Sequence, residues 1–306
     1  MTEFVVSTPA GRLRLRVAAA SHVGRVRTVN EDALVAEPPL FAVADGMGGH
    51  AFGERASARA IQTLRDRIDA GRLTGTNRVF AAIREANAAV RALTASAEDR
   101  KVGEKVGEKV IAGTTLTGVA LVQEHPAAVP QWMVFNLGDS RVYRWNGGAG
   151  GLEQISLDHS LVQELLDAGL IDEQGARKHP ERNVITRALG AADEVHAQAW
   201  LLPATHPQTF LICSDGLTKE LDDARIGELL ASLGAEQRPD AAVDRLLAAA
   251  LAAGGTDNVS IVLLQAERLV AADASEQDAA APFGGIDEHT HERRLSPELD
   301  DTHPRA

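Results

Sequence analysis

The sequence predicts an α+β fold of stacked layers, with largely antiparallel sheets. Strand-like and helix-like segments come in blocks, without the regular alternation of strand and helix that builds a parallel sheet. Hydrophobic residues make up 44% of the 306 residues, which is ordinary for a globular chain and is enough for a sizeable core.

The first half of the chain supplies two blocks of strands separated by a pair of helices. Apolar runs and alternating apolar residues predict strands over 12–24 and 33–45. Ala, Ile, Leu and Val recur at helical spacing in the next two segments, 53–70 and 77–94. Thr, Val and aromatic residues then alternate with little helical period, which favours strands. We expect these strands over 114–122, 131–139 and 141–145.

The second half begins with a helix predicted over 160–170, followed by a polar, irregular segment, 172–190. A continuous apolar run predicts a buried strand over 208–215. Two helices and a closing strand complete the ordered part, at about 223–233, 239–253 and 258–267.

These elements predict one domain over residues 1–267. From 268 to 306 the chain is acidic, rich in Pro and Gly and poor in large apolar side chains, so we expect a disordered tail. Within the domain, the charged segment 97–113 carries a short K-V-G-E near-repeat and is expected to be a mobile loop.

The charge and the cysteine content limit the function classes. A net charge of -12 repels nucleic-acid phosphates and anionic membrane surfaces, and no long run of Lys and Arg makes a local exception. No apolar segment is long enough for a signal peptide or a membrane span. The single cysteine, Cys213, rules out an internal disulfide and agrees with a reducing compartment. We therefore expect a cytoplasmic protein that binds neither nucleic acid nor membrane.

The segment "FAVADGMGGHAFGE", residues 41–54, allows two interpretations. Its G-x-G-x-x-A pattern satisfies the loose form of the dinucleotide fingerprint, with Asp66 about 20 residues further on. Alternatively, the glycines clear space beside an acid that binds metal. In a dinucleotide fold the helix after the glycines leads to a second parallel strand, but here it leads to another helix. Moreover, an ionised Asp45 directly before the first glycine would oppose a pyrophosphate, so the metal interpretation is favoured.

Other acids stand at equivalent places. Asp139 and Asp215 follow apolar strands, and Asp257 precedes the last strand. Glu31 and Asp32 lie between the first two strands. Stacked sheets bring their strand ends together, and clustered carboxylates repel one another unless cations neutralise them. Hard divalent cations prefer such oxygen ligands, so the pattern predicts a carboxylate-rich divalent metal site.

Eight ordered segments resemble the motifs of the PP2C (PPM) family of metal-dependent Ser/Thr protein phosphatases, in its bacterial form. The resemblance covers about residues 15–267, and it implies an α/β/β/α sandwich of two central antiparallel sheets flanked by helix pairs. It also implies a binuclear Mn²⁺ or Mg²⁺ site at one end. The segments are GRVRTVNEDA, VADGMGGH, AGTTLTGVAL, NLGDSRVYRW, DHSLVQELLDAGL, HPERNVITRALG, CSDGLTKEL and GGTDNVS.

The resemblance assigns the metal ligands position by position. Asp45 matches the carboxylate that bridges both ions, and the carbonyl of Gly46 and the side chain of Glu31 serve one of them. Asp215 and Asp257 hold the other ion. Two further acids match family positions: Asp32, which supports the ligands from behind, and Asp139, which with Asp215 binds a third, weaker metal in bacterial members.

The substrate side is also implied by the resemblance. Arg27 stands four residues before Glu31, where the family keeps its phosphate-binding arginine, and a guanidinium suits bidentate phosphate recognition. Residues 158–190 correspond to the flap subdomain. Within it, three residues are candidate contacts of the substrate or of the third metal: His179, Arg182 and Asn183.

The implied reaction is hydrolysis of phosphoserine and phosphothreonine by a metal-bridging hydroxide, without a phosphoenzyme. Phosphorylated proteins are then the partners, with a Ser/Thr kinase and its targets as the family's usual ones, and we expect a monomer. The general acid is unassigned. Met47 stands where many eukaryotic members have a histidine, so a metal-bound water is the first candidate and His50 the second.

Two rival interpretations remain. Cysteine phosphatases need Cys, five residues and Arg, but Lys219 stands at the arginine position after Cys213, so a buried strand cysteine is the better account. A pseudophosphatase would bind a phosphoprotein or a regulator without hydrolysis. Its expected signature is the loss of metal-ligating acids, and all of them are present.

Overall fold

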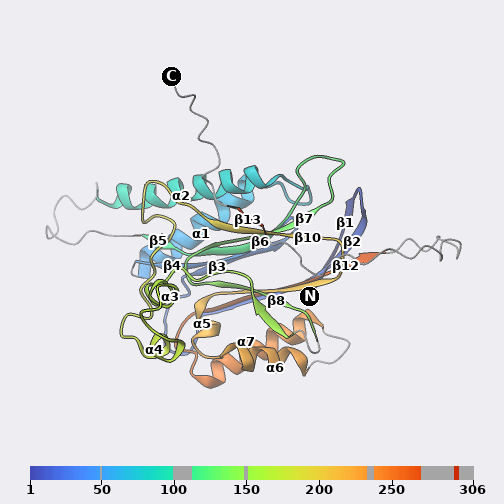
Figure 1. Ribbon diagram of the computed structural model, residues 1–306. Coiled ribbons are helices and arrows are strands. Elements are labelled where there is room, and N and C mark those ends of the chain that lie inside the picture. The colour runs from blue at the N-terminus through green and yellow to red at the C-terminus, as the bar shows by residue number, and fades with distance from the viewer. Residues whose placement is uncertain (49, 99–111, 148–150, 233–237, 270–292, 296–306) are drawn as a thin grey trace, which may run out of the picture.

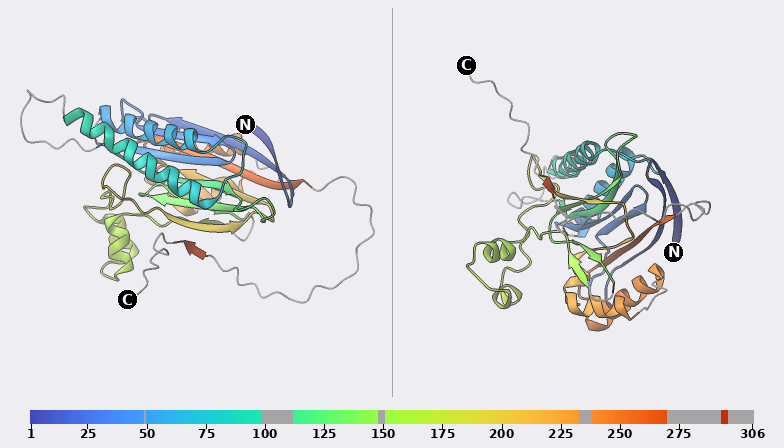
Figure 2. Two further views of the ribbon diagram at one scale, coloured as in Figure 1. Left: turned by 90° about the horizontal axis from the view of Figure 1, so that it is seen from above. Right: turned by 45° about the vertical axis from the view of Figure 1, so that its right-hand side comes forward.

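The computed structural model describes residues 1–48, 50–98, 112–147, 151–232, 238–269 and 293–295. Two antiparallel sheets are stacked face to face, and helices cover both outer faces (Figure 1). The right-hand view of Figure 2 shows α1 and α2 on one side of the sheets and α6 and α7 on the other, with the helical segment that follows β9 to one side. The observed architecture is the predicted α/β/β/α sandwich.

The first sheet has six strands. The long strands β2 and β12 pair along their whole lengths at its centre, in register from His22 opposite Val259 to Arg12 opposite Leu269. In spatial order the strands are β1 (Thr2–Thr8), β2 (Gly11–His22), β12 (Val259–Leu269), β11 (Gln208–Cys213), β8 (Arg141–Trp145) and β9 (Leu152–Gln154).

The second sheet has seven strands, of which the short β5 (Gly113–Thr114) pairs only with β4. Asp32 lies opposite Asp45 in the register of β3 with β4, which already places two of the predicted site acids side by side. The other strands, in spatial order, are β13 (Arg293–Leu295), β10 (Gln198–Pro203), β7 (Gln131–Leu137), β6 (Leu116–Val122), β4 (Leu40–Met47) and β3 (Asp32–Glu37).

Helices form the outer layers and a lateral segment. The pair α1 (His50–Arg67) and α2 (Thr76–Glu98) covers the second sheet, and α6 (Asp223–Ala231) and α7 (Pro239–Ala253) cover the first (Figure 1). The one-turn helix α5 (Asp215–Thr218) follows β11 directly. Two short helices make up the lateral segment, α3 (Leu161–Asp167) and α4 (Glu173–Lys178).

Strand alternation divides the core between the layers. In β4, Phe41 and Val43 point into the space between the sheets, whereas Ala42 and Ala44 face α1 and α2; all four are fully buried. Since successive residues of a strand point to opposite faces, a strand covered on both sides must be apolar throughout. Small alanines on the helix-facing side allow close approach of Ala56 and the rest of α1. The strand ends are thereby held by packing on both faces.

Several elements differ from the sequence predictions. The strands β1 and β10 were not predicted, and α4 forms inside the segment expected to be irregular. Its start is stabilised because the Asp172 side chain accepts a hydrogen bond from the Gly175 amide at 2.7 Å. Arg293–Leu295 pair with β10 as β13, within the segment expected to be a tail. Most of that tail and nearly all of the loop 97–113 lie outside the described residues, so their predicted disorder stays a prediction.

No helix in the described ranges is both long enough and apolar enough to cross a membrane.

Candidate metal centre

Four acids are delivered to one end of the sandwich by four different elements. Asp45 lies near the end of β4 and Asp139 just after β7, while Asp215 begins α5 and Asp257 precedes β12. Their charges act on one another: Asp215 and Asp139 both raise the pKa of Asp45 after the larger effect of burial. The fold therefore brings together acids that are up to 212 residues apart, from Asp45 to Asp257 (257 − 45).

The backbone around Asp45 is tightly held. Its amide donates to Thr115 Oγ1 at 3.0 Å, and its carbonyl accepts from the Thr115 amide at 2.9 Å and from Thr114 Oγ1 at 2.9 Å. The Gly46 amide donates to the Glu31 carbonyl at 3.1 Å. A Cβ at Gly46 would lie 2.2 Å from the Gly53 carbonyl oxygen, so only glycine allows this close approach.

A second close approach joins α5 to the start of β12. A Cβ at Gly216 would lie 1.9 Å from the backbone oxygen of Asn258. The glycine after Asp215 therefore lets the helix start lie against the strand start, which brings Asp215 next to Asp257. Gly46 and Gly216 both lack a side chain where another backbone segment lies close. This role was expected from the sequence for the glycines that follow Asp45.

Burial and like charges make the cluster unfavourable without cations. Burial, followed by the charge of Asp215, raises the pKa of Asp139 to about 8. The pKa of Asp45 is raised well above its usual range by burial and by Asp215, Asp32 and Asp139. Burial raises the pKa of Asp32 to about 7, against the lowering effect of hydrogen bonds from Ser260 and Ser214. Such carboxyl groups require protons or cations as partners.

Several oxygens of the cluster have no hydrogen-bond partner within the described part of the chain. Buried carboxylate oxygens are normally satisfied, so unpaired ones point to a missing ligand. The unpaired atoms are Glu31 Oε1, Asp32 Oδ1, Asp139 Oδ1 and Asp215 Oδ1.

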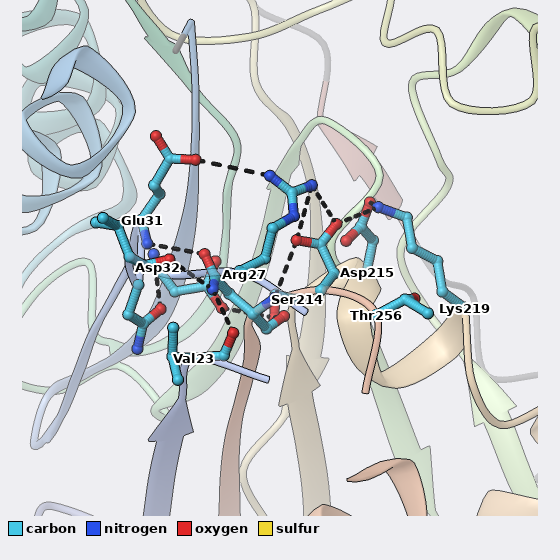
Figure 3. Close-up of polar contacts among 12 residues, drawn as sticks. Val23, Arg27, Glu31, Asp32, Ser214, Asp215, Lys219 and Thr256 are labelled. Atoms are coloured by element: carbon cyan, nitrogen blue, oxygen red, sulfur yellow. Dashed lines mark hydrogen bonds and ion pairs between the residues drawn. The ribbon is translucent and has the colours of Figure 1, made fainter. Parts of the chain in front are cut away.

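Asn258 ties the first loop to the last strand. Its Nδ2 donates to the carbonyls of Val23 and Val29, at 2.9 Å each, and its Oδ1 accepts from the Glu31 amide at 2.8 Å. The loop also carries Arg27, whose Nη2 lies 3.0 Å from Asp257 Oδ1, with Nη1 3.9 Å from Glu31 Oε2 (Figure 3). The guanidinium is half-exposed, so it is open to a ligand at the rim of the cluster.

Lys219 lies on the other side of the cluster. Its Nζ is 2.6 Å from Asp215 Oδ2 and 2.8 Å from Asp257 Oδ2 (Figure 3). Burial lowers the pKa of Lys219, but the two ion pairs outweigh it and raise the pKa overall. Burial raises the pKa of Asp257, but the contact with Lys219, the hydrogen bond from the Asn258 amide and the charge of Arg27 outweigh it and lower the pKa overall.

The donor set fits hard divalent cations. Carboxylates and a backbone carbonyl are the ligands that Mg²⁺ and Mn²⁺ prefer, and neither thiol nor imidazole is needed. As they stand, no three His, Cys, Asp or Glu side chains of the described residues are arranged to hold a metal ion. In this arrangement Lys219 contacts carboxylate oxygens of Asp215 and Asp257, and Arg27 contacts those of Asp257.

The predicted flap residues lie apart from these contacts. Arg182 and Asn183 are exposed, and the Arg182 amide donates to the His179 carbonyl within the same segment. The segment is anchored where it begins: Arg141 donates to both oxygens of Asp158, with Nη2 2.7 Å from Oδ2. Figure 1 places α3 and α4 at the same end of the sandwich as α5.

Sequence reasoning missed two residues of the cluster, Lys219 and Asn258. In the sequence, Lys219 was noted only because it stands where a cysteine phosphatase would need an arginine. Its spacing of four residues from Asp215 is nevertheless typical of an ion pair on one helical face. Asn258 directly follows a predicted ligand, Asp257. Its role was missed because it depends on a contact with Glu31, which is 227 residues away in the chain. The dinucleotide alternative loses support, since Asp66 is exposed on α1 and accepts a hydrogen bond from Gln62.

Cys213 should be chemically inert and dispensable for activity. The residue is fully buried in β11, and burial raises the pKa of its thiol to about 12, so almost no thiolate exists at neutral pH. We expect iodoacetamide to label Cys213 only after unfolding in guanidinium, as measured by intact mass. Cys213→Ala should retain phosphatase turnover within about threefold, because buried structural cysteines act only through packing. Loss of turnover in a folded Cys213→Ala protein would restore the cysteine mechanism.

Known proteins of one family are similar to this chain. The family model described as protein phosphatase 2C matches residues 20–252. The chain is 37% identical over 256 residues to serine/threonine protein phosphatase PstP of Mycobacterium tuberculosis, covering 82% of this chain but 45% of that protein. It therefore spans a little under half the length of that relative. Serine/threonine phosphatase stp of Listeria monocytogenes is 32% identical over 258 residues, with 79% of this chain and 92% of that protein covered.

Solved structures show the same fold. The catalytic domain of PstP in complex with two manganese ions matches with a TM-score of 0.67 and 34% identity, over 83% of this chain and 99% of that one. Fold, motif order and sequence identity agree, and the chain belongs to the protein phosphatase 2C family.

Proposed function

We propose that the protein is a metal-dependent phosphoprotein phosphatase that hydrolyses phosphoserine and phosphothreonine. The observation that carries the proposal is the cluster of buried carboxylates with unpaired oxygens at one end of the sandwich. Arg27 lies at its rim and is half-exposed. The names of the family relatives support the same activity.

In this proposal the acids hold two divalent cations, Mn²⁺ or Mg²⁺. Asp45 serves both, with the Gly46 carbonyl and Glu31 beside one ion and Asp215 and Asp257 beside the other. The two manganese ions in the PstP structure support the number. Asp139, with Asp215, is the candidate for a third, weaker site, since its buried Oδ1 is unpaired.

The bound cations supply the charge that activates water for attack on phosphorus and that stabilises the phosphoryl group. The chain's own residues do the rest. Asp32 accepts a hydrogen bond from Ser214 at 2.9 Å, which positions it behind the ligands. Arg27 can release Asp257 and turn its guanidinium toward two phosphate oxygens. Met47 has no acidic proton, so the leaving alkoxide takes its proton from solvent or another group.

Substrate contacts are proposed to come from the flap, residues 158–190, with His179, Arg182 and Asn183 as candidates. Its anchoring through Arg141 and Asp158 and its exposed tip support such a role. We further propose a cytoplasmic monomer that acts on a Ser/Thr kinase and its targets. The single cysteine supports the reducing compartment.

The catalytic domain is proposed to cover residues 1–267, with a C-terminal tail from 268 to 306. The end of β12 at Leu269, two residues further on, and the family match over 20–252 support a boundary near this point. Within the tail, Arg293–Leu295 return to the domain and pair with β10.

The purified chain should hydrolyse p-nitrophenyl phosphate and phospho-Ser/Thr peptides with Mn²⁺ and lose this activity with EDTA. Excess Mn²⁺ should restore it, because chelation removes the cations and leaves the fold. Equilibrium dialysis would give the number of ions bound per chain, and the same assays with Mg²⁺ would rank the two metals.

A folded sample that binds Mn²⁺ but hydrolyses neither substrate would contradict the enzyme proposal. That result would favour the alternative, a pseudophosphatase that binds a phosphoprotein or a regulator. The presence of every predicted metal-ligating acid argues for the enzyme.

A further inference from the structure

Lys219 is engaged with the two acids assigned to one metal ion. It follows Asp215 by four residues, so α5 carries the ammonium back over the carboxylate, and the same group reaches Asp257. About two-thirds of the side chain is shielded from solvent, which leaves the ion pairs little screened. Its charge also acts on Asp45 and Asp139, in opposition to their burial.

The oxygens of the two acids are unequally engaged. Asp257 is saturated, because Oδ1 accepts from the Asn258 amide and Arg27, and Oδ2 accepts from Lys219 and Arg27. In Asp215, Oδ2 contacts Lys219 whereas Oδ1 has no partner among the described residues. A metal ion between these acids can use the unpaired Oδ1 of Asp215, but at Asp257 it must displace or share an oxygen that Lys219, Arg27 or the Asn258 amide already contacts.

We propose that Lys219 is a built-in counter-ion, which holds Asp215 and Asp257 together without metal and competes with the divalent cation for them. The inference rests on the proposed function, in which these two acids serve one ion. Two nearby carboxylates repel each other unless a cation lies between them, and a tethered ammonium supplies that cation at every metal concentration. Once a divalent cation binds, the same positive charge is repulsive and weakens its binding.

The roles of Arg27 and Lys219 differ in this respect. Arg27 is half-exposed and is offered to the phosphate, so its removal would change substrate binding as well. Lys219 contacts only the carboxylates in the interactions described above. Replacing Lys219 therefore tests how a nearby positive charge affects metal binding, without removing a group proposed to bind the phosphate.

The test compares Lys219→Met, Lys219→Gln and Lys219→Arg with the wild type. Arg84→Met is the matched control, because it removes one positive charge from an exposed position in the middle of α2, away from the proposed site. The first readout is the midpoint of thermal unfolding in EDTA. The second is the Mn²⁺ dissociation constant from titration calorimetry of the metal-free protein, and turnover of p-nitrophenyl phosphate by the wild type is followed in parallel.

Both neutral variants should bind Mn²⁺ about tenfold more tightly, since a positive charge near the ion has been removed. Their metal-free unfolding midpoint should fall by about 3 °C or more, since the two carboxylates lose their shared cation. Lys219→Arg should stay within about threefold of the wild-type affinity because it keeps the charge. Arg84→Met should match the wild type in both measurements.

Equal or weaker Mn²⁺ binding by both neutral variants would overturn the counter-ion role, and so would an unchanged midpoint in EDTA. If the wild type still binds Mn²⁺ and turns over substrate, that failure concerns Lys219 alone. A wild type that binds no Mn²⁺ would overturn the proposed function and the counter-ion role together.

Discussion

Asp45→Asn is expected to reduce turnover at saturating Mn²⁺ by about three orders of magnitude or more, a loss of ~4 kcal/mol in transition-state stabilisation. The amide keeps the shape of the side chain but loses the charge that the two cations would share in the proposed site. The same variant should raise the stability of the metal-free protein. Burial and neighbouring acids hold the pKa of Asp45 well above its usual range, so the ionised carboxylate opposes folding at neutral pH.

The sign of the stability effect follows from proton binding. With a raised folded pKa, the folded state holds more protons than the unfolded state, and its stability falls as the pH rises from the ordinary carboxyl pKa up through the raised pKa of the folded protein. Asparagine removes that penalty, so the unfolding midpoint in EDTA should rise by a few degrees, at about 2–4 °C per kcal/mol. Thermal unfolding and p-nitrophenyl phosphate kinetics measure both effects.

Asp66→Asn is the matched control for this substitution. Asp66 is exposed on α1 and touches Gln62, so neither turnover nor the unfolding midpoint should change appreciably. If Asp66→Asn reduced activity as much as Asp45→Asn, the dinucleotide interpretation would regain support. Substantial turnover by folded Asp45→Asn would remove Asp45 from the proposed ligands.

Gly216→Ala is expected to cost about 3 kcal/mol of unfolding free energy, at the upper end of the range for overpacking. The added Cβ would lie 1.9 Å from the Asn258 carbonyl oxygen and 2.9 Å from its carbonyl carbon. Backbone at the start of β12 cannot rotate away as a side chain does, so α5 must shift. That shift separates Asp215 from Asp257, and Mn²⁺ affinity should fall together with stability.

Gly227→Ala provides the control at another helical glycine. Its Cβ would make ordinary contacts, 3.7 Å from Leu152 and 3.9 Å from Trp145. Because alanine favours a helix interior over glycine, Gly227→Ala should be neutral or stabilise by about 0.5–1 kcal/mol. Chemical denaturation and Mn²⁺ titration compare the two variants. Equal behaviour of both would contradict the close approach at Gly216.

The layered fold could be predicted from the sequence because local patterns of apolar residues indicate its strands and helices. The apolar run before Asp45 and the one before Cys213 predicted buried strands, and both strands are buried on two faces. The strand β10 escaped detection, since its apolar run, 199–202, is only four residues long and its pairing with β7 is tertiary. The helix α4 was missed because six residues show too little periodicity, although Asp172 is a recognisable N-cap.

For the site, sequence position predicted which acids stand at strand ends, and the fold brings these ends together. The contacts of the two basic residues were not predictable in the same way. Arg27 and Lys219 approach Asp257 from elements 230 and 38 residues away, and no local pattern specifies which carboxylate each will contact. Gly216 shows the same limit, since its need for space comes from Asn258.

The pairing of β2 with β12 has a consequence for the time at which the site can form during synthesis. β12 lies at the centre of its sheet, and Asn258 closes the loop that carries Glu31 across 227 residues. A ribosome synthesises the chain from its N-terminus to its C-terminus, so β2 emerges long before β12. Pairings between segments so distant in the sequence form late and slowly. A nascent chain ending before Asp257 lacks both that ligand and the amide that holds the first loop. If Asp257 holds metal as proposed, we expect metal binding and turnover only after synthesis has passed Asn258 and β12 has paired with β2.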